Sequence, residues 1–165
     1  MVTKPETERY RRIIQLIGQE RFSLLQNSSV TIVGLGAVGG HTLEALVRAG
    51  IGSIRLVDFD TIQPSNLNRQ IIATTSNIGT SKVQEAKKRA LAINPDCKVE
   101  ALEIFAAEET METILSPQPD LLVDARDSLN PKIQLLAVIY YAGVQLMSSM
   151  GAALRTDPIK IRYGD

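Results

Sequence analysis

The chain has too few cysteines for an intrachain disulfide or a paired-cysteine zinc site, and it has no apolar run long enough for a membrane span. Its 165 residues include one cysteine, Cys97, and one histidine, His41. A single cysteine cannot form an intrachain disulfide or supply a paired-cysteine zinc site, which is typical of a reducing compartment. We find no run of about 18 apolar residues and no charged-then-apolar leader, so we expect a cytoplasmic protein without a membrane span.

An excess of charge of either sign is also missing. Lys plus Arg and Asp plus Glu number 18 each, so bulk charge neither favours nor excludes a nucleic-acid partner. The hydrophobic content of 44% and the chain length are typical of one globular domain with a substantial core.

The clearest local pattern is a glycine-rich turn between a strand and a helix. The β-branched run 29–33 is followed by Gly34, Gly36 and Gly39 in G-x-G-x-x-G spacing, and then by apolar residues at helical spacing over 40–50. Such glycines allow close approach to a phosphate, and the helix N-terminus favours an anion. The pattern predicts a nucleotide site.

The remaining sequence alternates strand and helix patterns. We predict strands over 53–58, 98–104, 120–124 and 144–149, and helices over 79–93, 108–115 and 131–142, the last with Pro131 at its first position. This order implies an α/β, Rossmann-like fold with a mostly parallel sheet and helices on both faces. The helical spacing over 9–25 predicts an N-terminal helical arm, so we divide the chain into residues 1–28 and 29–165.

A polar segment after the second strand changes what the glycine-rich loop implies. Asp58 alone would suit a ribose hydroxyl, as in a dehydrogenase. The chain then continues through Asp60 to Ser65-Asn-Leu-Asn-Arg-Gln70, whose side chains suit a polyphosphate better than a nicotinamide. In parallel sheets ligands bind beyond the carboxyl ends of the strands, where Gly34, Asp58 and residues 124–127 are expected to converge.

Taken together, these motifs resemble the E1-like adenylating enzymes typified by ThiF and MoeB, over nearly the whole chain. The motifs are Arg9-Tyr-Arg-Arg12, the Gly34 loop, Ala49-Gly-Ile-Gly52, Asp58-Phe-Asp60, Ser65-Asn-Leu-Asn-Arg-Gln70, Gly79-Thr-Ser-Lys82 and Asp124-Ala-Arg-Asp127. The resemblance implies that residues 29–165 form an ATP-binding adenylation domain that uses ATP and Mg²⁺ and works as a homodimer.

The resemblance also implies roles for individual residues. Asp58 would hold the ribose, Asp127 would help to hold Mg²⁺, and Arg12 would reach across the homodimer. The implied catalytic residues are Arg12, Arg69, Lys82 and Asp127. The implied nucleotide-binding residues are Gly34, Gly36, Gly39, Asp58, Asp60, Ser65, Asn66, Asn68, Arg69, Lys82, Asp127 and Ser128, among which Asn66, Arg69 and Lys82 would contact phosphates.

Within the family, the chain is most similar to the tRNA threonylcarbamoyladenosine dehydratases, the TcdA or CsdL subgroup. That similarity is carried by the segments 49–52, 68–71, 93–97, 127–132 and 151–159. It implies ATP-dependent activation of the threonyl carboxylate of the modified tRNA nucleoside, then ring closure with loss of water. A sulfur-carrier or sulfurtransferase protein is a further partner that it implies. The family continues beyond Asp165, so we expect acceptor-binding residues outside this chain.

Three other functions stay open from the residues alone. One is adenylation of the C-terminal glycine of a ubiquitin-like sulfur carrier, although members that do this often have paired-cysteine zinc motifs. Another is an NAD(P)-dependent dehydrogenase, which leaves residues 66–70 and Lys82 unexplained. The last is a non-catalytic nucleotide-sensing domain, which Arg69, Lys82 and Asp127 disfavour.

Each residue assignment has a purely structural alternative. Asp58 and Asp60 could form a turn at a strand end, Asn66 and Asn68 could form Asx turns, and Lys82 could be a solvated helix residue. Asp127 could cap the helix near Pro131. Arg126 could pair with phosphate or point to solvent. For Cys97 we favour a small residue at a strand start, and for His41 a surface or packing residue.

Overall fold

A five-stranded, all-parallel sheet forms the centre of the molecule. The computed structural model describes residues 8–127, 129–149, 157, 160–162 and 164. The strands are β1 (Ser29–Val33), β2 (Ser53–Val57), β3 (Lys98–Leu102), β4 (Leu121–Asp124) and β5 (Leu146–Ser148), in the order β3-β2-β1-β4-β5. The predicted α/β class and parallel sheet are confirmed: the four described pairings within the sheet are parallel, and an isolated antiparallel bridge joins Thr61 and Ser81 outside it.

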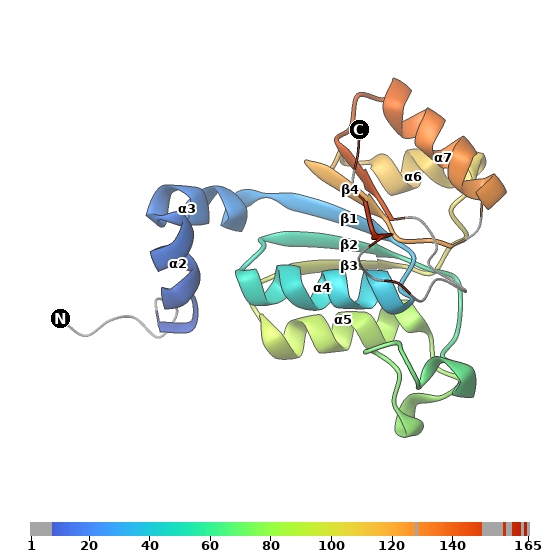
Figure 1. Cartoon of the computed structure of the whole chain (residues 1–165), viewed down its shortest axis with the longest axis horizontal. Coiled ribbons are helices and arrows are strands. Elements are labelled where there is room, and N and C mark those ends of the chain that lie inside the picture. Colours follow the sequence, from blue (N-terminus) through green and yellow to red (C-terminus); the bar gives the residue numbers. More distant parts are fainter. Residues whose placement is uncertain (1–7, 128, 150–156, 158–159, 163, 165) are drawn as a thin grey trace.

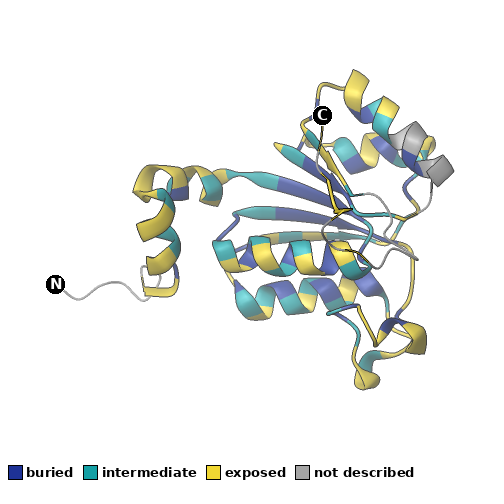
Figure 2. Ribbon diagram, viewed as in Figure 1, coloured by how far each residue is buried: buried dark blue, intermediate teal, exposed yellow. Residues whose placement is uncertain are grey.

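Helices cover both faces of this sheet, as predicted (Figure 1). One face packs against α4 (Ala37–Ala49) and α5 (Lys82–Ile93), and the other against α6 (Met111–Leu115) and α7 (Leu129–Tyr141). Successive strand residues point to opposite faces, so the strands need apolar side chains on both. Figure 2 shows the resulting buried sheet centre. The first core includes Ile32, Leu43, Leu56 and Val83, and the second includes Val33, Val57, Ile114 and Ile139.

Several predicted boundaries are wrong by one to three residues. Helix α4 begins at Ala37, so Gly39 lies within its first turn. Helix α5 begins only at Lys82, because the chain before it pairs with the segment after β2 through the Ile62 N–H and the Thr80 carbonyl, 2.8 Å apart. Helix α7 begins at Leu129, which makes Pro131 its third residue. Short 3₁₀ turns occupy Pro64–Asn66, Thr75–Asn77 and Glu108–Thr110, the last directly before α6.

The N-terminal segment, predicted to be a helical arm, forms two helices. Gly18, at φ +83°, separates α2 (Arg11–Ile17) from α3 (Gln19–Asn27). The rings of Tyr10 and Phe22 lie 5.1 Å apart, and a Cβ added at Gly50 would come within 3.0 Å of both. These contacts hold the helices beside the amino ends of the strands (Figure 1).

Candidate functional site

The glycine-rich loop lies at the carboxyl end of β1 and is packed too closely for side chains at two positions. Gly34 has φ +92°, and a Cβ there would lie 2.9 Å from Cγ of Arg126. A Cβ on Gly39 would lie only 1.8 Å from the Gly34 carbonyl oxygen. At Gly36 the nearest atom to an added Cβ is Nε2 of Gln70, at 3.9 Å. The loop therefore has no room for a side chain at Gly34 or Gly39, because other protein atoms lie too close, whereas it has room for one at Gly36.

The carboxylate of Asp58 joins this loop to the segment after β2. Its Oδ2 accepts a hydrogen bond from the Leu35 N–H at 2.6 Å, and its Oδ1 accepts one from the Asp60 N–H at 2.9 Å. Each carboxylate oxygen can accept a second hydrogen bond. Asp58 therefore stabilises the turn at the end of the strand, as expected if its role is structural. Its carboxylate oxygens can still accept a further hydrogen bond from a ribose hydroxyl.

Lys82 and Asp60 form an ion pair beside this turn. The Lys82 ammonium lies 2.9 Å from Oδ2 of Asp60, and the lysine side chain is only 7% exposed. Lys82 is the first residue of α5, and its own N–H donates to the Asp60 carbonyl. Lys82 is therefore not a solvated helix residue, because its ammonium is buried against Asp60 at the carboxyl edge of the sheet.

Within the polar segment 64–70, Asn66 is buried and stabilises the backbone, whereas Arg69 is exposed. Asn66 is buried, and its Oδ1 accepts a hydrogen bond from the Gln63 N–H at 2.9 Å. Arg69 is exposed, and its Nη1 donates to the Ser65 carbonyl at 2.8 Å and to Oδ1 of Asn68 at 3.0 Å. Arg69 is thus placed at the surface of a segment that its own side chain helps to stiffen.

A buried ionic cluster closes the end of β4. Asp124 is fully buried, with Nε of Arg126 at 3.0 Å and Nζ of Lys132 at 3.1 Å. Lys132 also donates to the carbonyls of Arg126 and Ser149. Arg126 does not point to solvent, since its side chain is 12% exposed. No role was assigned to Lys132 from the sequence, although it ends the segment 127–132 on which the subgroup resemblance partly rests.

Asp127 follows this cluster and is exposed. The Ala125 N–H donates to the Val33 carbonyl at 2.8 Å, so this stretch runs beside the Gly34 loop. Helix α7 begins two residues after Asp127, which disfavours the capping alternative. Ser128 lies outside the described residues. The described residues contain no cluster of three potential metal ligands, so a metal ion here would depend on Asp127 together with ligand oxygens.

Arg12 is not brought to these residues within one chain. It is exposed on α2, which lies at the amino-end side of the sheet, whereas the other residues gather beyond the carboxyl ends (Figure 1). An intrachain role for Arg12 at the nucleotide site is therefore excluded by the arrangement of the described elements.

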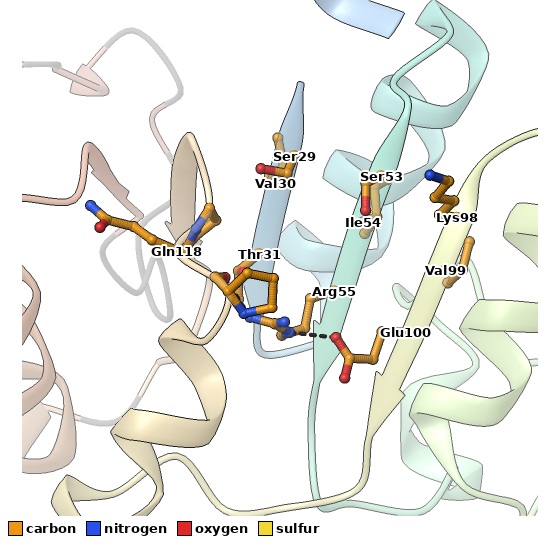
Figure 3. Close-up of a pocket in the computed structure, with 12 residues that line it drawn as sticks. Ser29, Val30, Thr31, Ser53, Ile54, Arg55, Lys98, Val99, Glu100 and Gln118 are labelled. Atoms are coloured by element: carbon orange, nitrogen blue, oxygen red, sulfur yellow. Dashed lines mark hydrogen bonds and ion pairs between the residues drawn. The ribbon is translucent and has the colours of Figure 1, made fainter. Parts of the chain in front are cut away.

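A separate cavity of about 300 Å³ lies over the amino halves of β1, β2 and β3 (Figure 3). Arg55 borders it and donates to Glu100 and to the carbonyls of Ile114, Ser116 and Pro117. The guanidinium therefore anchors the turn before β4. Because this cavity is far along the strands from the glycine-rich loop, we assign it no part in nucleotide binding.

The single cysteine and histidine have structural surroundings. Cys97 is buried directly before β3, and burial raises its thiol pKa to about 11, which disfavours the reactive thiolate. His41 is exposed on α4, and its Nδ1 lies 2.7 Å from the Ala37 carbonyl oxygen. Both positions agree with the structural interpretation of these residues.

Comparison with known proteins identifies the family. The ThiF family model matches residues 10–165. The chain belongs to the ThiF family. One relative, the tRNA threonylcarbamoyladenosine dehydratase of Bacillus subtilis, is 42% identical over 149 residues, which cover 90% of this chain and 59% of the relative. The sulfur carrier protein adenylyltransferase of Thermus thermophilus is 41% identical over 128 residues, covering 76% of this chain and 47% of that protein.

Solved structures of the family agree with this fold. The Escherichia coli tRNA threonylcarbamoyladenosine dehydratase TcdA in complex with ATP has a TM-score of 0.92 and 31% identity, covering 98% of this chain and 67% of that one. The same enzyme has been solved with AMP. The chain spans about three fifths of the length of the dehydratases of Bacillus subtilis and Escherichia coli, and two fifths of the length of dehydratase 2 of Saccharomyces cerevisiae. Among the described helices, none has both the length and the apolar character needed to cross a bilayer.

Proposed function

We propose that this chain carries the ATP-binding and adenylating part of a cytoplasmic tRNA threonylcarbamoyladenosine dehydratase. The observation that carries the proposal is the similarity, over 98% of the chain at a TM-score of 0.92, to such an enzyme solved with ATP. The geometry supports it, because the Gly34 loop, Asp58 and the Lys82–Asp60 pair lie at one edge of the sheet. Ligands of open α/β sheets bind at this edge.

The residues at this edge fit a bound ATP. Asp58 would accept from a ribose hydroxyl while it holds the turn in place. The phosphates would lie at the open Gly36 side of the loop, near the N-terminus of α4, which favours anions. Asn66 would hold the segment 64–70 in position, and the cations Arg69 and Lys82 would face the phosphates.

The proposed reaction needs alignment more than proton transfer. A carboxylate is already ionised at neutral pH and attacks the α-phosphate of ATP with loss of pyrophosphate. The site must align two anions and neutralise the charge that develops on the leaving group. Arg69 and Lys82 supply positive charge, and Asp127 would hold Mg²⁺, which adds further charge neutralisation when bound. The proposed chemistry assigns no role to His41, which is exposed on α4.

We propose that the enzyme is a homodimer to which each subunit contributes Arg12. The arm that carries Arg12 has exposed apolar side chains, with Leu16 80% and Leu24 64% exposed. A second copy that covered these side chains would bring Arg12 toward the carboxyl edge of the neighbouring sheet. The site would then be complete only in the dimer.

A second candidate acceptor is the C-terminal glycine of a ubiquitin-like sulfur carrier. The 41% identity to the Thermus thermophilus sulfur carrier protein adenylyltransferase favours it. The adenylation step would use the same residues, and only the acceptor surface would differ. A sulfur-carrier or sulfurtransferase protein would in that case be a partner.

The deciding experiment is nucleoside mass spectrometry of threonylcarbamoyl-modified tRNA after incubation with the full-length protein, ATP and Mg²⁺. Release of AMP and pyrophosphate is followed in parallel. We expect the modified adenosine to lose the mass of one water. An unchanged nucleoside, with pyrophosphate exchange only when a Gly-Gly-ending carrier is added, would transfer the assignment to sulfur-carrier activation.

A further inference from the structure

The ionic cluster at the end of β4 occupies both oxygens of the Asp124 carboxylate. Oδ1 accepts hydrogen bonds from the N–H and the Nε of Arg126, at 3.3 Å and 3.0 Å. Oδ2 accepts one from the Ser148 hydroxyl at 3.2 Å and lies 3.1 Å from Nζ of Lys132. Each carboxylate oxygen has two lone pairs, so Asp124 has none left for a ligand. This buried carboxylate therefore holds its protein neighbours in place and does not bind a ligand.

Lys132 fixes the turn that follows β4. Its ammonium donates to the Arg126 carbonyl at 2.7 Å and to the Ser149 carbonyl at 2.6 Å, in addition to the ion pair with Asp124. These three oxygens match the three N–H groups of an ammonium. The lysine side chain is only 3% exposed, so water competes little for these contacts. Lys132 thereby joins α7 and the end of β5 to the residue directly before Asp127.

The same turn packs against the glycine-rich loop. The Ala125 N–H donates to the Val33 carbonyl at 2.8 Å, and a Cβ added at Gly34 would lie 3.2 Å from the Ala125 carbonyl oxygen. Asp127 is the last residue of this turn that the structure describes. It is exposed, and its carboxylate has no hydrogen bond or ion pair with any other described residue. Of the two aspartates that follow one another here, the buried one is fully paired and the exposed one is free beside the loop.

We propose that Lys132 is a positioning residue for Asp127, the carboxylate that would hold Mg²⁺. This inference deepens the proposed function and rests on it. Mg²⁺ requires near-ideal octahedral geometry and is usually held by one or two carboxylates together with substrate phosphates. A site with a single protein carboxylate is therefore sensitive to where that carboxylate lies. Lys132 is too deeply buried to contact the ligand, and it acts by fixing the backbone immediately before Asp127.

The test is calorimetric titration of the full-length protein with ATP at a series of Mg²⁺ concentrations and, separately, in EDTA. We expect Lys132→Met to raise the Mg²⁺ concentration that half-maximally tightens ATP binding about tenfold, the effect of losing a group that orients a metal ligand. ATP affinity in EDTA should stay at the wild-type value, because Lys132 does not contact the nucleotide. Asp127→Ala should raise the Mg²⁺ requirement at least as much. Lys98→Met, at an exposed position on β3, is the matched control and should titrate as the wild type does.

A double variant separates positioning from stability. Lys132→Met alone leaves the Asp124 carboxylate buried without its lysine, so we expect a lower unfolding temperature in the absence of nucleotide. Asp124→Asn combined with Lys132→Met removes both charges, and the asparagine oxygen can still accept from Arg126. The double variant should unfold at a higher temperature than Lys132→Met. It should still need about tenfold more Mg²⁺ than the wild type, because the two hydrogen bonds from Lys132 to backbone carbonyls remain absent.

The inference is overturned if the double variant needs no more Mg²⁺ than the wild type, or if Lys132→Met weakens ATP binding equally with Mg²⁺ and in EDTA. A normal Mg²⁺ requirement in Asp127→Ala would overturn the metal assignment of the proposed function and this inference with it. If all the variants titrate as expected but the wild type leaves the tRNA nucleoside unchanged, the proposed acceptor fails and the inference stands.

Discussion

Two glycines of the same loop should respond very differently to one added methyl group. In Gly39→Ala the new Cβ would lie 1.8 Å from the Gly34 carbonyl oxygen, and backbone atoms cannot move aside as a flexible side chain can. We expect a loss of about 3 kcal/mol in the free energy of unfolding, at the upper end for overpacking. Urea denaturation measures this loss.

Gly36→Ala is the matched comparison. Its Cβ would have only Nε2 of Gln70 nearby, at 3.9 Å, so stability should change by less than about 1 kcal/mol. Its ATP affinity should fall, because the methyl group occupies the open side of the loop. Equal stability losses in the two variants would contradict the packing described for this loop.

Lys82 provides a test of charge at the site. Lys82→Ala removes the buried ammonium that pairs with Asp60, and we expect adenylation to fall by at least about a hundredfold while ATP binding weakens. Pyrophosphate exchange and titration with ATP measure these two effects. Lys88→Ala is a suitable control, since that side chain is 72% exposed on the same helix. Normal exchange by Lys82→Ala would remove Lys82 from the proposed mechanism.

At the scale of elements, Glu44 joins two helices on one face of the sheet. From α4 it forms ion pairs with Arg48 on the same helix and Arg89 on α5. The hydrogen bond from Arg89, followed by that from Arg48, lowers the pKa of Glu44 below its ordinary value of 4.5. A carboxylate with a lowered pKa in the folded state stabilises that state above its unfolded pKa, and this contribution is lost as the pH falls through the folded value.

This linkage predicts how Glu44→Gln behaves with pH. At pH 7 the variant should be less stable by about 1 kcal/mol, because the side chain is 14% exposed and the pairs are only partly screened. The difference from the wild type should shrink as the pH falls below about 4.5. Urea denaturation at a series of pH values gives the curve, with the exposed Glu103→Gln as control. A difference that stays constant down to pH 3 would argue against the charge-based explanation.

At the scale of the whole molecule, the proposed dimer predicts complementation between two inactive variants. Arg12 lies at the amino-end side of its own sheet and Lys82 at the carboxyl edge, so the two residues would meet only across an interface. Arg12→Ala and Lys82→Ala should each be inactive alone. After subunit exchange, mixed dimers contain one intact site, and an equimolar mixture should recover about a quarter of wild-type activity if exchange is random.

Light scattering before and after mixing confirms that the oligomeric state is unchanged by either substitution. Recovery that requires both variants supports a shared site. A mixture that stays inactive although the subunits have exchanged would show that Arg12 acts elsewhere.

The local patterns of the sequence determined the elements and much of the site. The β-branched run before Gly34 and the acid at the end of the next strand were enough to predict the Rossmann-like order and the place of Asp58, because alternation and turn chemistry act over short distances. Boundaries were less well predicted. Tertiary pairing between Ile62 and Thr80 delays the start of α5 until Lys82, and no local signal shows that.

Only the tertiary structure decided which polar side chains are paired. Arg126 and Lys132 both turn inward to Asp124, because a fully buried carboxylate needs nearby cations and donors. Lys82 is buried against Asp60, whereas Arg69, from a motif equally rich in polar residues, stays exposed. Among the described residues, the buried Oε1 of Gln70 finds no hydrogen-bond partner. Such differences depend on which groups from distant segments share one buried space, and residue type and spacing do not encode this.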